Sequence, residues 1–213
     1  MIASVRLFTA YAWRRRRSER GAVLVELAII LPLLMAISLA TLDLGLGWRT
    51  SLTVSGASRA GARAVSNLGI NVQADRSTLQ SVAAALGTVP ASQIEMVVIY
   101  RSTTADGAPP AGCVSSTALS NGGDSSLFCN TYSGTELSQI AAGAGPTFGT
   151  GCTLSRDRRW CPPNRNNSQA STSGPDFAGV YVKVNHRTST KMFGTTFVVD
   201  DFAVMPLEPG AGN

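Results

Sequence analysis

The architecture follows from one stretch of sequence, RGAVLVELAIILPLLMAISLATLDLGLGW, which occupies residues 20–48. Within it, residues 22–42 are apolar or small apart from Glu26, Pro32, Ser38 and Thr41. A helix rises about 1.5 Å per residue, so about 20 residues of this kind cross the hydrocarbon core of a bilayer. We therefore predict a transmembrane helix over residues 22–48, which reaches the outer membrane interface near Trp48.

The excess of basic residues lies before this stretch. The chain of 213 residues has 18 Lys and Arg against 13 Asp and Glu. Six arginines and Glu19 fall within residues 1–20, so the remainder carries 12 residues of each sign. Positive charge is retained on the cytoplasmic side, which predicts a basic cytoplasmic leader over residues 1–21 and an extracytoplasmic domain over residues 49–213. No basic groove with interleaved aromatic residues follows the leader, so nucleic acid is not an expected partner.

A cleavable secretory signal is the alternative interpretation of the apolar stretch. Ser38 and Ala40 supply the small residues that a signal peptidase needs at positions −3 and −1. However, residues 22–37 already reach or exceed the usual length of the apolar region of a signal peptide, and helix-compatible sequence continues through Leu68. These two features favour a retained membrane anchor.

Glu26 is unusual inside an apolar segment. A carboxylate costs about 2.5 to 3.5 kcal/mol at the centre of a membrane helix and less near its end, where it can reach the headgroups. Its spacing offers a second explanation. Gly21 is followed by four small or apolar residues beginning with Ala22, and Glu26 comes next, which resembles the type IV prepilin processing motif. The resemblance implies cleavage between Gly21 and Ala22 by a membrane aspartyl peptidase, and pairing of Glu26 with the new α-amino group of a neighbouring subunit.

The similarity to pilins extends downstream. The region from Arg20 to Ser66 resembles the TadE family of pseudopilins from tight-adherence, or Flp-type, pilus systems. Members of that family combine an Arg-Gly start, a glutamate, an early proline, an acidic residue near the outer end and an Ala-Arg-rich helix. The corresponding features here are Arg20, Gly21, Glu26, Pro32, Asp43 and the run ASRAGAR at residues 57–63.

The resemblance implies a function, partners and a location. The chain would be a minor pilin or pseudopilin, that is, a structural or assembly component of a Tad/Flp-type adhesive pilus. Its partners would be other pilins and pseudopilins, the prepilin peptidase, the inner-membrane pilus assembly platform and the lipid bilayer. Its location would be the bacterial cytoplasmic membrane, as a single-pass protein with the N-terminus inside and the C-terminal domain outside, or a surface pilus.

Beyond the membrane segment, the sequence predicts two helices. Apolar and small residues recur at steps of three and four with polar residues opposite, which indicates an amphipathic stalk over residues 49–68. The apolar set is Val54, Ala57, Gly61, Val65 and Leu68, and the polar set is Arg59, Arg63 and Ser66. A second helix is expected to begin at a cap formed by Asp75 or Ser77 and to stop at Gly87.

Alternating apolar residues predict three strands. Residues 94–101 should form a strand with both faces covered, and residues 178–187 and 196–205 should form a hairpin with Gly194 in the connection. The predicted fold class is therefore a membrane α-helix plus an α+β domain, in which a stalk and a second helix accompany a small antiparallel sheet.

Residues 102–177, between the first strand and the hairpin, are expected to be a long insertion. The stretch is rich in Gly, Ser, Thr, Asn and Pro, and it is too long for a bare loop. It holds all four cysteines, whose spacing does not indicate a zinc site: Cys113, Cys129, Cys152 and Cys161. Export favours disulfides. Of the three possible connectivities we favour Cys113–Cys129 and Cys152–Cys161, because bonds between nearest neighbours close the shortest loops. These disulfides would stabilise a stretch whose apolar content is low.

The sequence contains no recognisable catalytic, cofactor-binding or metal-binding constellation. It lacks a nucleophile elbow, a phosphate-binding loop and a zinc-protease motif. Its only histidine, His186, is expected at a strand end as a surface or hairpin residue. We expect that the chain is not an enzyme. The alternative function is that of a signal-anchored extracytoplasmic binding or adhesion protein unrelated to pili.

Overall fold

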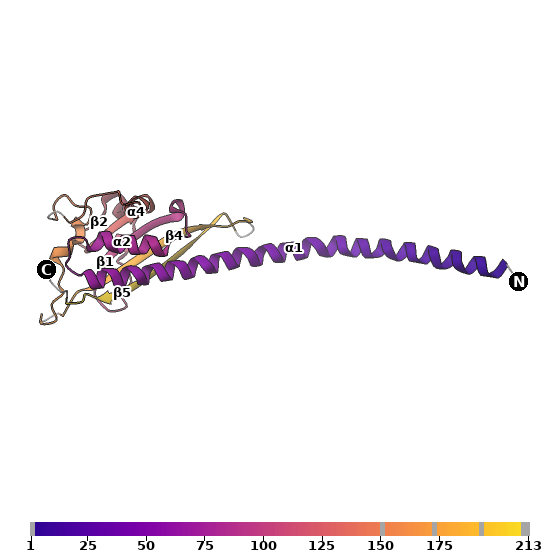
Figure 1. The fold of residues 1–213 in the computed structure, drawn as a ribbon, viewed down its shortest axis with the longest axis horizontal. Helices are drawn as coiled ribbons and strands as arrows, with labels where there is room; N and C mark the ends of the chain where they lie inside the picture. Colours follow the sequence, from indigo (N-terminus) through magenta and orange to yellow (C-terminus); the bar gives the residue numbers. More distant parts are fainter. Residues whose placement is uncertain (1–2, 150–151, 172–173, 192–193, 210–213) are drawn as a thin grey trace. The chain divides into compact units, whose positions relative to one another are not determined.

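A computed structural model describes residues 3–149, 152–171, 174–191 and 194–209, with side chains from Gly21 onward. The chain separates into two compact units, Met1–Gly45 and Leu46–Asn213. One helix, α1 (Ala3–Leu68), begins in the first unit and ends in the second (Figure 1). The predicted long N-terminal helix is therefore confirmed.

The first unit consists of the N-terminal part of α1. The helix runs through Pro32 without a break, although proline removes one backbone hydrogen bond. The hydroxyls of Ser38 and Thr41 donate to backbone carbonyls one turn earlier, at 2.8 and 2.9 Å. Neither hydroxyl is left unpaired within the apolar stretch, which suits an environment without water.

The part of α1 in the second unit is amphipathic, as predicted. The expected apolar positions are buried up to residue 65, and Leu68 is half-buried, whereas Arg59 and Arg63 are exposed. Ser66 is a correction. We expect it on the solvent side from the helical pattern, but it is buried and its Oγ donates to the carbonyl oxygen of Pro206 at 2.6 Å.

The second helix, α2 (Ala74–Ala85), forms where the sequence predicts it but begins differently. Its N-cap residue is Gln73, and no side chain caps the first turn. The prediction that Asp75 or Ser77 caps this helix is wrong, because Asp75 lies inside the first turn with its carboxylate buried against distant residues. The helix ends just before Gly87, close to the predicted stop.

An antiparallel sheet forms the centre of the second unit, in the order β2-β3-β1-β4-β5. The strands are β1 (Ile94–Ser102), β2 (Gly123–Asp124), β3 (Cys129–Ser133), β4 (Phe177–Arg187) and β5 (Thr196–Pro206), and the short 3₁₀ helix η1 (Ala91–Gln93) leads into β1. β1 pairs with β3 on one side and β4 on the other, and β4 and β5 form the predicted hairpin. The predicted small antiparallel sheet is confirmed, with β2 and β3 in addition.

The stretch that we expect as an insertion contributes to both sheet and core. It holds β2 and β3, the helices α3 (Ser116–Asn121) and α4 (Gly134–Ala141), and the 3₁₀ helices η2 (Ala111–Val114), η3 (Arg158–Trp160) and η4 (Pro162–Asn164). β3 pairs with β1 over five residues, so this stretch is integral to the sheet. Although the stretch has few apolar residues, several of them belong to the main core: Tyr132, Leu137, Ile140, Phe148 and Trp160.

Two disulfides are part of the fold. Cys113 is bonded to Cys129 with a Cα–Cα distance of 6.1 Å, and Cys152 to Cys161 with a distance of 5.6 Å. These are the pairs that nearest-neighbour closure favours.

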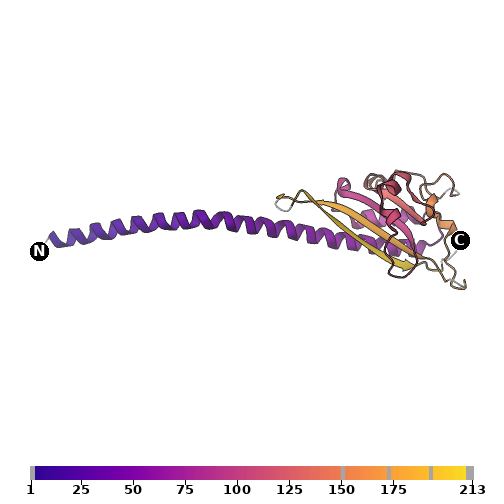
Figure 2. The same cartoon turned by 180° about the vertical axis from the view of Figure 1, so that it is seen from behind.

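The two faces of the sheet bury different clusters. On one face, apolar side chains of α1, α2 and α4 pack against β1 and β4. On the other face, the Cys113–Cys129 disulfide packs against Met96, Val98 and Tyr181 of the same strands. Figure 2 views the sheet from this side, with the orange and yellow strands β4 and β5 in front of the helix. The sheet is thus covered by helices on one face and, on the other, partly by the loop that the Cys113–Cys129 disulfide closes.

Candidate functional site

The residues predicted for peptidase recognition lie in the exposed part of α1. Gly21, Ala22 and Glu26 are all exposed. A Cβ added at Gly21 would meet no atom within 4 Å. Within the described part of the chain, nothing shields the peptide bond between Gly21 and Ala22.

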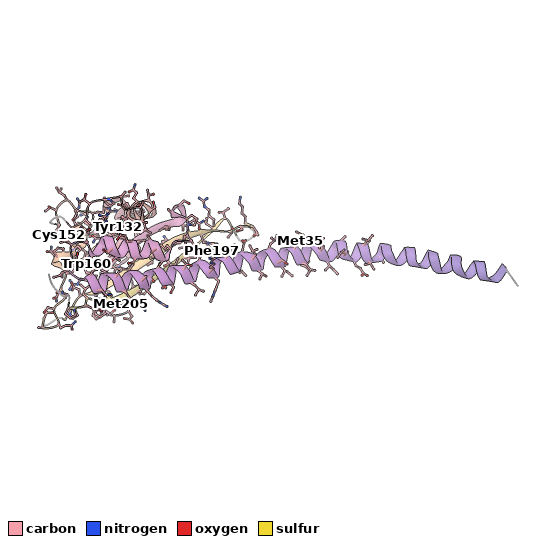
Figure 3. All side chains as sticks on the ribbon, viewed as in Figure 1. Met35, Tyr132, Cys152, Trp160, Phe197 and Met205 are labelled. Carbon is pink, nitrogen blue, oxygen red and sulfur yellow. A yellow bond between two sulfur atoms is a disulfide. The ribbon has the colours of Figure 1, made fainter. Side chains whose placement is uncertain are left out.

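The helix that follows is apolar on every side. All its large apolar side chains from Val23 to Leu42 are between 41% and 71% exposed, and Figure 3 shows that of Met35 projecting freely. Its most apolar part has a mean hydropathy of 2.6, and none of that part is buried in the structure. By length and composition, this helix can cross a membrane. A helix that is hydrophobic all round is normally surrounded by lipid or by protein.

A buried polar cluster lies in the second unit and consists of Asp75, Asn130, Tyr132 and Arg165. The carboxylate of Asp75 accepts hydrogen bonds from Nδ2 of Asn130 at 2.8 Å and from the hydroxyl of Tyr132 at 3.0 Å. Nη2 of Arg165 donates to the other carboxylate oxygen at 2.5 Å. Neither Asp75 nor Arg165 has any exposed side-chain area. The cluster therefore joins α2, β3 and the segment after η4 around one buried ion pair.

Electrostatics identify this cluster as a structural feature. Burial raises the pKa of Asp75, and the guanidinium of Arg165 opposes that shift. Burial also raises the pKa of Tyr132, and the charge of Asp75 adds to the effect. Arg165 lies over the ring of Trp160 at 4.2 Å from its centroid. The four side chains are closed to solvent, so they have no route to a substrate.

A groove of 430 Å³ opens between α3, the start of α4 and residues 146–147 and 154–158. It contains Arg156, whose Nε and Nη2 donate to the two carboxylate oxygens of Glu136 at 2.5 and 3.0 Å. Burial alone would raise the pKa of Glu136, but Arg156 and the backbone amide of Ser133 hold it below its ordinary value. Most of the remaining lining is polar, and Arg158 is its exposed cation. Such a groove suits a hydroxyl-rich or charged ligand better than an apolar one. Sequence reasoning singled out none of its residues.

His186 is held by packing against α1. Its Nδ1 lies 2.9 Å from Oγ1 of Thr50, and its ring centroid lies 4.8 Å from that of Phe197. It is half-buried and lies in the β4–β5 hairpin, one of the two placements that the sequence predicts. Within the described residues, no group of three or more His, Cys, Asp or Glu side chains is arranged to hold a metal ion.

Comparison with known proteins bears on the N-terminal segment. No curated protein and no solved structure matches the chain. Residues 21–63 match the family model described as TadE-like protein, and they include the apolar helix and the Ala-Arg-rich run. The predicted resemblance is confirmed: over residues 21–63, the chain is similar to the TadE-like family.

Proposed function

We propose that this protein is a minor pilin or pseudopilin of a Tad/Flp-type adhesive pilus. The match to the TadE-like family indicates involvement in Tad pilus assembly, and it carries the proposal. The all-round apolar helix supports it, because the helix needs lipid or other apolar helices as its surroundings. The absence of a chemical constellation in the sequence agrees with a structural role rather than an enzymatic one.

The topology is part of the proposal. Residues 1–21 form a cytoplasmic leader, residues 22–48 cross the cytoplasmic membrane, and residues 49–213 lie outside it. The arginine-rich leader supports this orientation, since positive charge is retained inside. Two disulfides in the domain also support it, because such bonds persist in oxidising compartments.

Glu26 has a specific role in this proposal. The prepilin peptidase cuts between Gly21 and Ala22, and the carboxylate of Glu26 then neutralises the α-amino group of a neighbouring pilin or pseudopilin on the assembly platform. The exposure of Glu26 supports this role, because its carboxylate is accessible to a second chain. A carboxylate beside an ammonium is paired, which makes its presence in lipid tolerable.

Mass spectrometry of the membrane-extracted protein tests the processing step. We expect a mature N-terminus at Ala22. An N-terminus at Met1 would instead support a plain membrane anchor, and one at Thr41 would support the secretory-signal interpretation.

Substitution of Glu26 tests the assembly step. We expect Glu26→Gln to insert and to be processed normally, but to reduce piliation in a deletion background, because the amide keeps the shape and loses the charge. Glu26→Ala should insert at least as well as the wild type, since a charge is removed from the apolar segment. Normal piliation with normally processed Glu26→Gln would exclude the ion-pair role.

The groove favours a second candidate function. A signal-anchored extracytoplasmic adhesion protein would use its polar lining, including Arg158, to bind a surface ligand. Two observations separate the candidates. Retention of Met1 together with unchanged piliation in the deletion strain would favour adhesion, whereas an Ala22 terminus and loss of pili would favour the pilin function.

A further inference from the structure

A pocket of 170 Å³ opens beside α1 in the second unit, and we call it the basic pocket. Its polar groups come from Arg49, Thr50, Thr53, Thr88, Gln93 and His186, and none of the described lining residues is acidic. Its volume is below that of typical sites for drug-sized ligands, so it suits one small polar group.

The hydrogen bonds around Thr50 assign the tautomer of His186. The hydroxyl of Thr50 donates its single hydrogen to the carbonyl oxygen of Leu46 at 3.1 Å. It must therefore accept from Nδ1 of His186, which lies 2.9 Å away and carries the hydrogen. In the neutral ring, Nε2 is then a hydrogen-bond acceptor. No described residue donates to Nε2, so it is available to a donor on a ligand.

Arg49 supplies the charge of the basic pocket. It is exposed, and its guanidinium has no ion-pair partner within the described part of the chain. A guanidinium presents a fork of donors that matches the oxygens of a phosphate. The pocket thus combines a site for a phosphate at Arg49 with an acceptor for a ligand hydroxyl at His186.

The place of the pocket along α1 indicates where that ligand comes from. In the sequence, the apolar stretch ends at Leu42, and Leu46 and Arg49 of the pocket follow it four and seven residues later. The headgroup layer of a bilayer is about 5 to 8 Å thick on each side, and long arginine side chains reach back toward it. Trp48, on the same turn as Arg49, is 71% exposed, which is typical of an aromatic anchor at the interface.

We propose that the basic pocket binds the headgroup of an anionic, hydroxyl-bearing phospholipid of the outer leaflet, with the chemistry of phosphatidylglycerol. The phosphate lies against Arg49, and a glycerol hydroxyl donates to Nε2 of His186. Phosphatidylethanolamine is disfavoured, because its ammonium group would share the pocket with the cation of Arg49, and the described lining residues offer no carboxylate to offset that repulsion. This inference rests on the proposed topology, but it does not depend on peptidase processing.

Native mass spectrometry of the full chain in detergent tests the proposal. The protein is titrated with phosphatidylglycerol or phosphatidylethanolamine of identical acyl chains. We expect phosphatidylglycerol to bind more tightly, and Arg49→Gln to weaken its binding by about tenfold, since one charge-assisted contact is lost. His186→Gln should reduce the preference for phosphatidylglycerol over a methylated phosphate diester lipid that lacks hydroxyls.

Arg59→Gln is the matched control. Arg59 is an exposed arginine of the same helix outside the basic pocket, and its substitution removes the same charge. It should leave the affinity within about twofold of the wild type. The basic leader is identical in all variants, so its attraction for anionic lipid cancels in the comparison.

Three results would overturn the proposal. They are equal binding of the two phospholipids, equal effects of Arg49→Gln and Arg59→Gln, and displacement of the lipid by millimolar inorganic phosphate, which would identify a site for a free anion. Failure of the pilin function appears separately, as retention of Met1 or normal piliation without this protein.

Discussion

The two halves of α1 share one secondary structure and differ in how their apolar residues are covered. From Val23 to Leu42 the large apolar side chains are at least 41% exposed, whereas Val54 and Val65 are fully buried. In the first half the apolar residues surround the helix, and in the second half they form one stripe. The sheet of the same chain covers the stripe, but an all-round apolar surface needs surroundings from outside the chain.

Helix formation by itself therefore does not determine whether a helix packs against its own chain or against other surroundings. The second unit supplies its own core, ion pairs and disulfides, so its stability should respond strongly to changes in buried residues. Exposed residues on the same helix provide controls. The following predictions use urea unfolding of the full chain in detergent, followed by circular dichroism.

The largest effect is expected at the buried ion pair. Arg165→Met leaves the carboxylate of Asp75 buried without its cation, which should lower the free energy of unfolding by about 3–5 kcal/mol. Arg63→Met removes an exposed arginine of α1 and should change it by less than about 0.5 kcal/mol. Similar decreases in the free energy of unfolding in both variants would contradict the structural role of the buried polar cluster.

Removal of a disulfide should have the next largest effect. Replacing Cys113 and Cys129 by serine should lower the free energy of unfolding by about 2–4 kcal/mol. The sequence separation is 16 residues for Cys113–Cys129 and 9 residues for Cys152–Cys161. Because a shorter loop loses less entropy on closure, replacing Cys152 and Cys161 should lower the free energy of unfolding by about 0.5 kcal/mol less. The reverse order would show that contacts of the loops, rather than closure entropy, set the difference.

Replacing a glycine of α1 by alanine should lower the free energy of unfolding at Gly61 and raise it at Gly56. A Cβ at Gly61 would lie 2.6 Å from Cγ2 of Val82 and 2.9 Å from Cγ1 of Val180, so Gly61→Ala should cost about 1–3 kcal/mol. A Cβ at Gly56 would meet nothing within 4 Å, so Gly56→Ala should gain up to about 1 kcal/mol from helix propensity. Stabilisation by both changes would refute close packing of the stripe.

The smallest effect is expected at the groove and depends on pH. Glu136→Gln keeps the capping box of α4 but removes the ion pair with Arg156, which should cost about 1–2 kcal/mol at pH 7. The folded-state pKa of Glu136 lies below its ordinary value of 4.5, so its contribution is present above that value and is lost as the pH falls through the lower folded pKa. The wild type and the variant should therefore converge in acid. A constant difference from pH 7 to pH 3 would rule out this linkage.

Local patterns predicted the elements whose signal lies in neighbouring residues. The apolar length of residues 22–42 predicted the long helix, steps of three and four predicted the stripe of the stalk, and alternation predicted β1 and the hairpin. The disulfide pairs followed from loop length. Each of these depends on spacing within a short window, which a sequence shows directly.

The tertiary structure alone decided which polar residues are buried and which strand joins β1. The sequence predicts Asp75 as a helix cap, because aspartate is favoured near the start of a helix. Its hydrogen-bond partners nevertheless lie 55 to 90 residues away in the sequence. Ser66 likewise bonds to a carbonyl 140 residues further along the chain. A polar residue that is paired across such distances has the same local sequence pattern as one that faces water. The pattern shows only the spacing of polar and apolar residues along the chain, whereas the distant partner is determined by the fold.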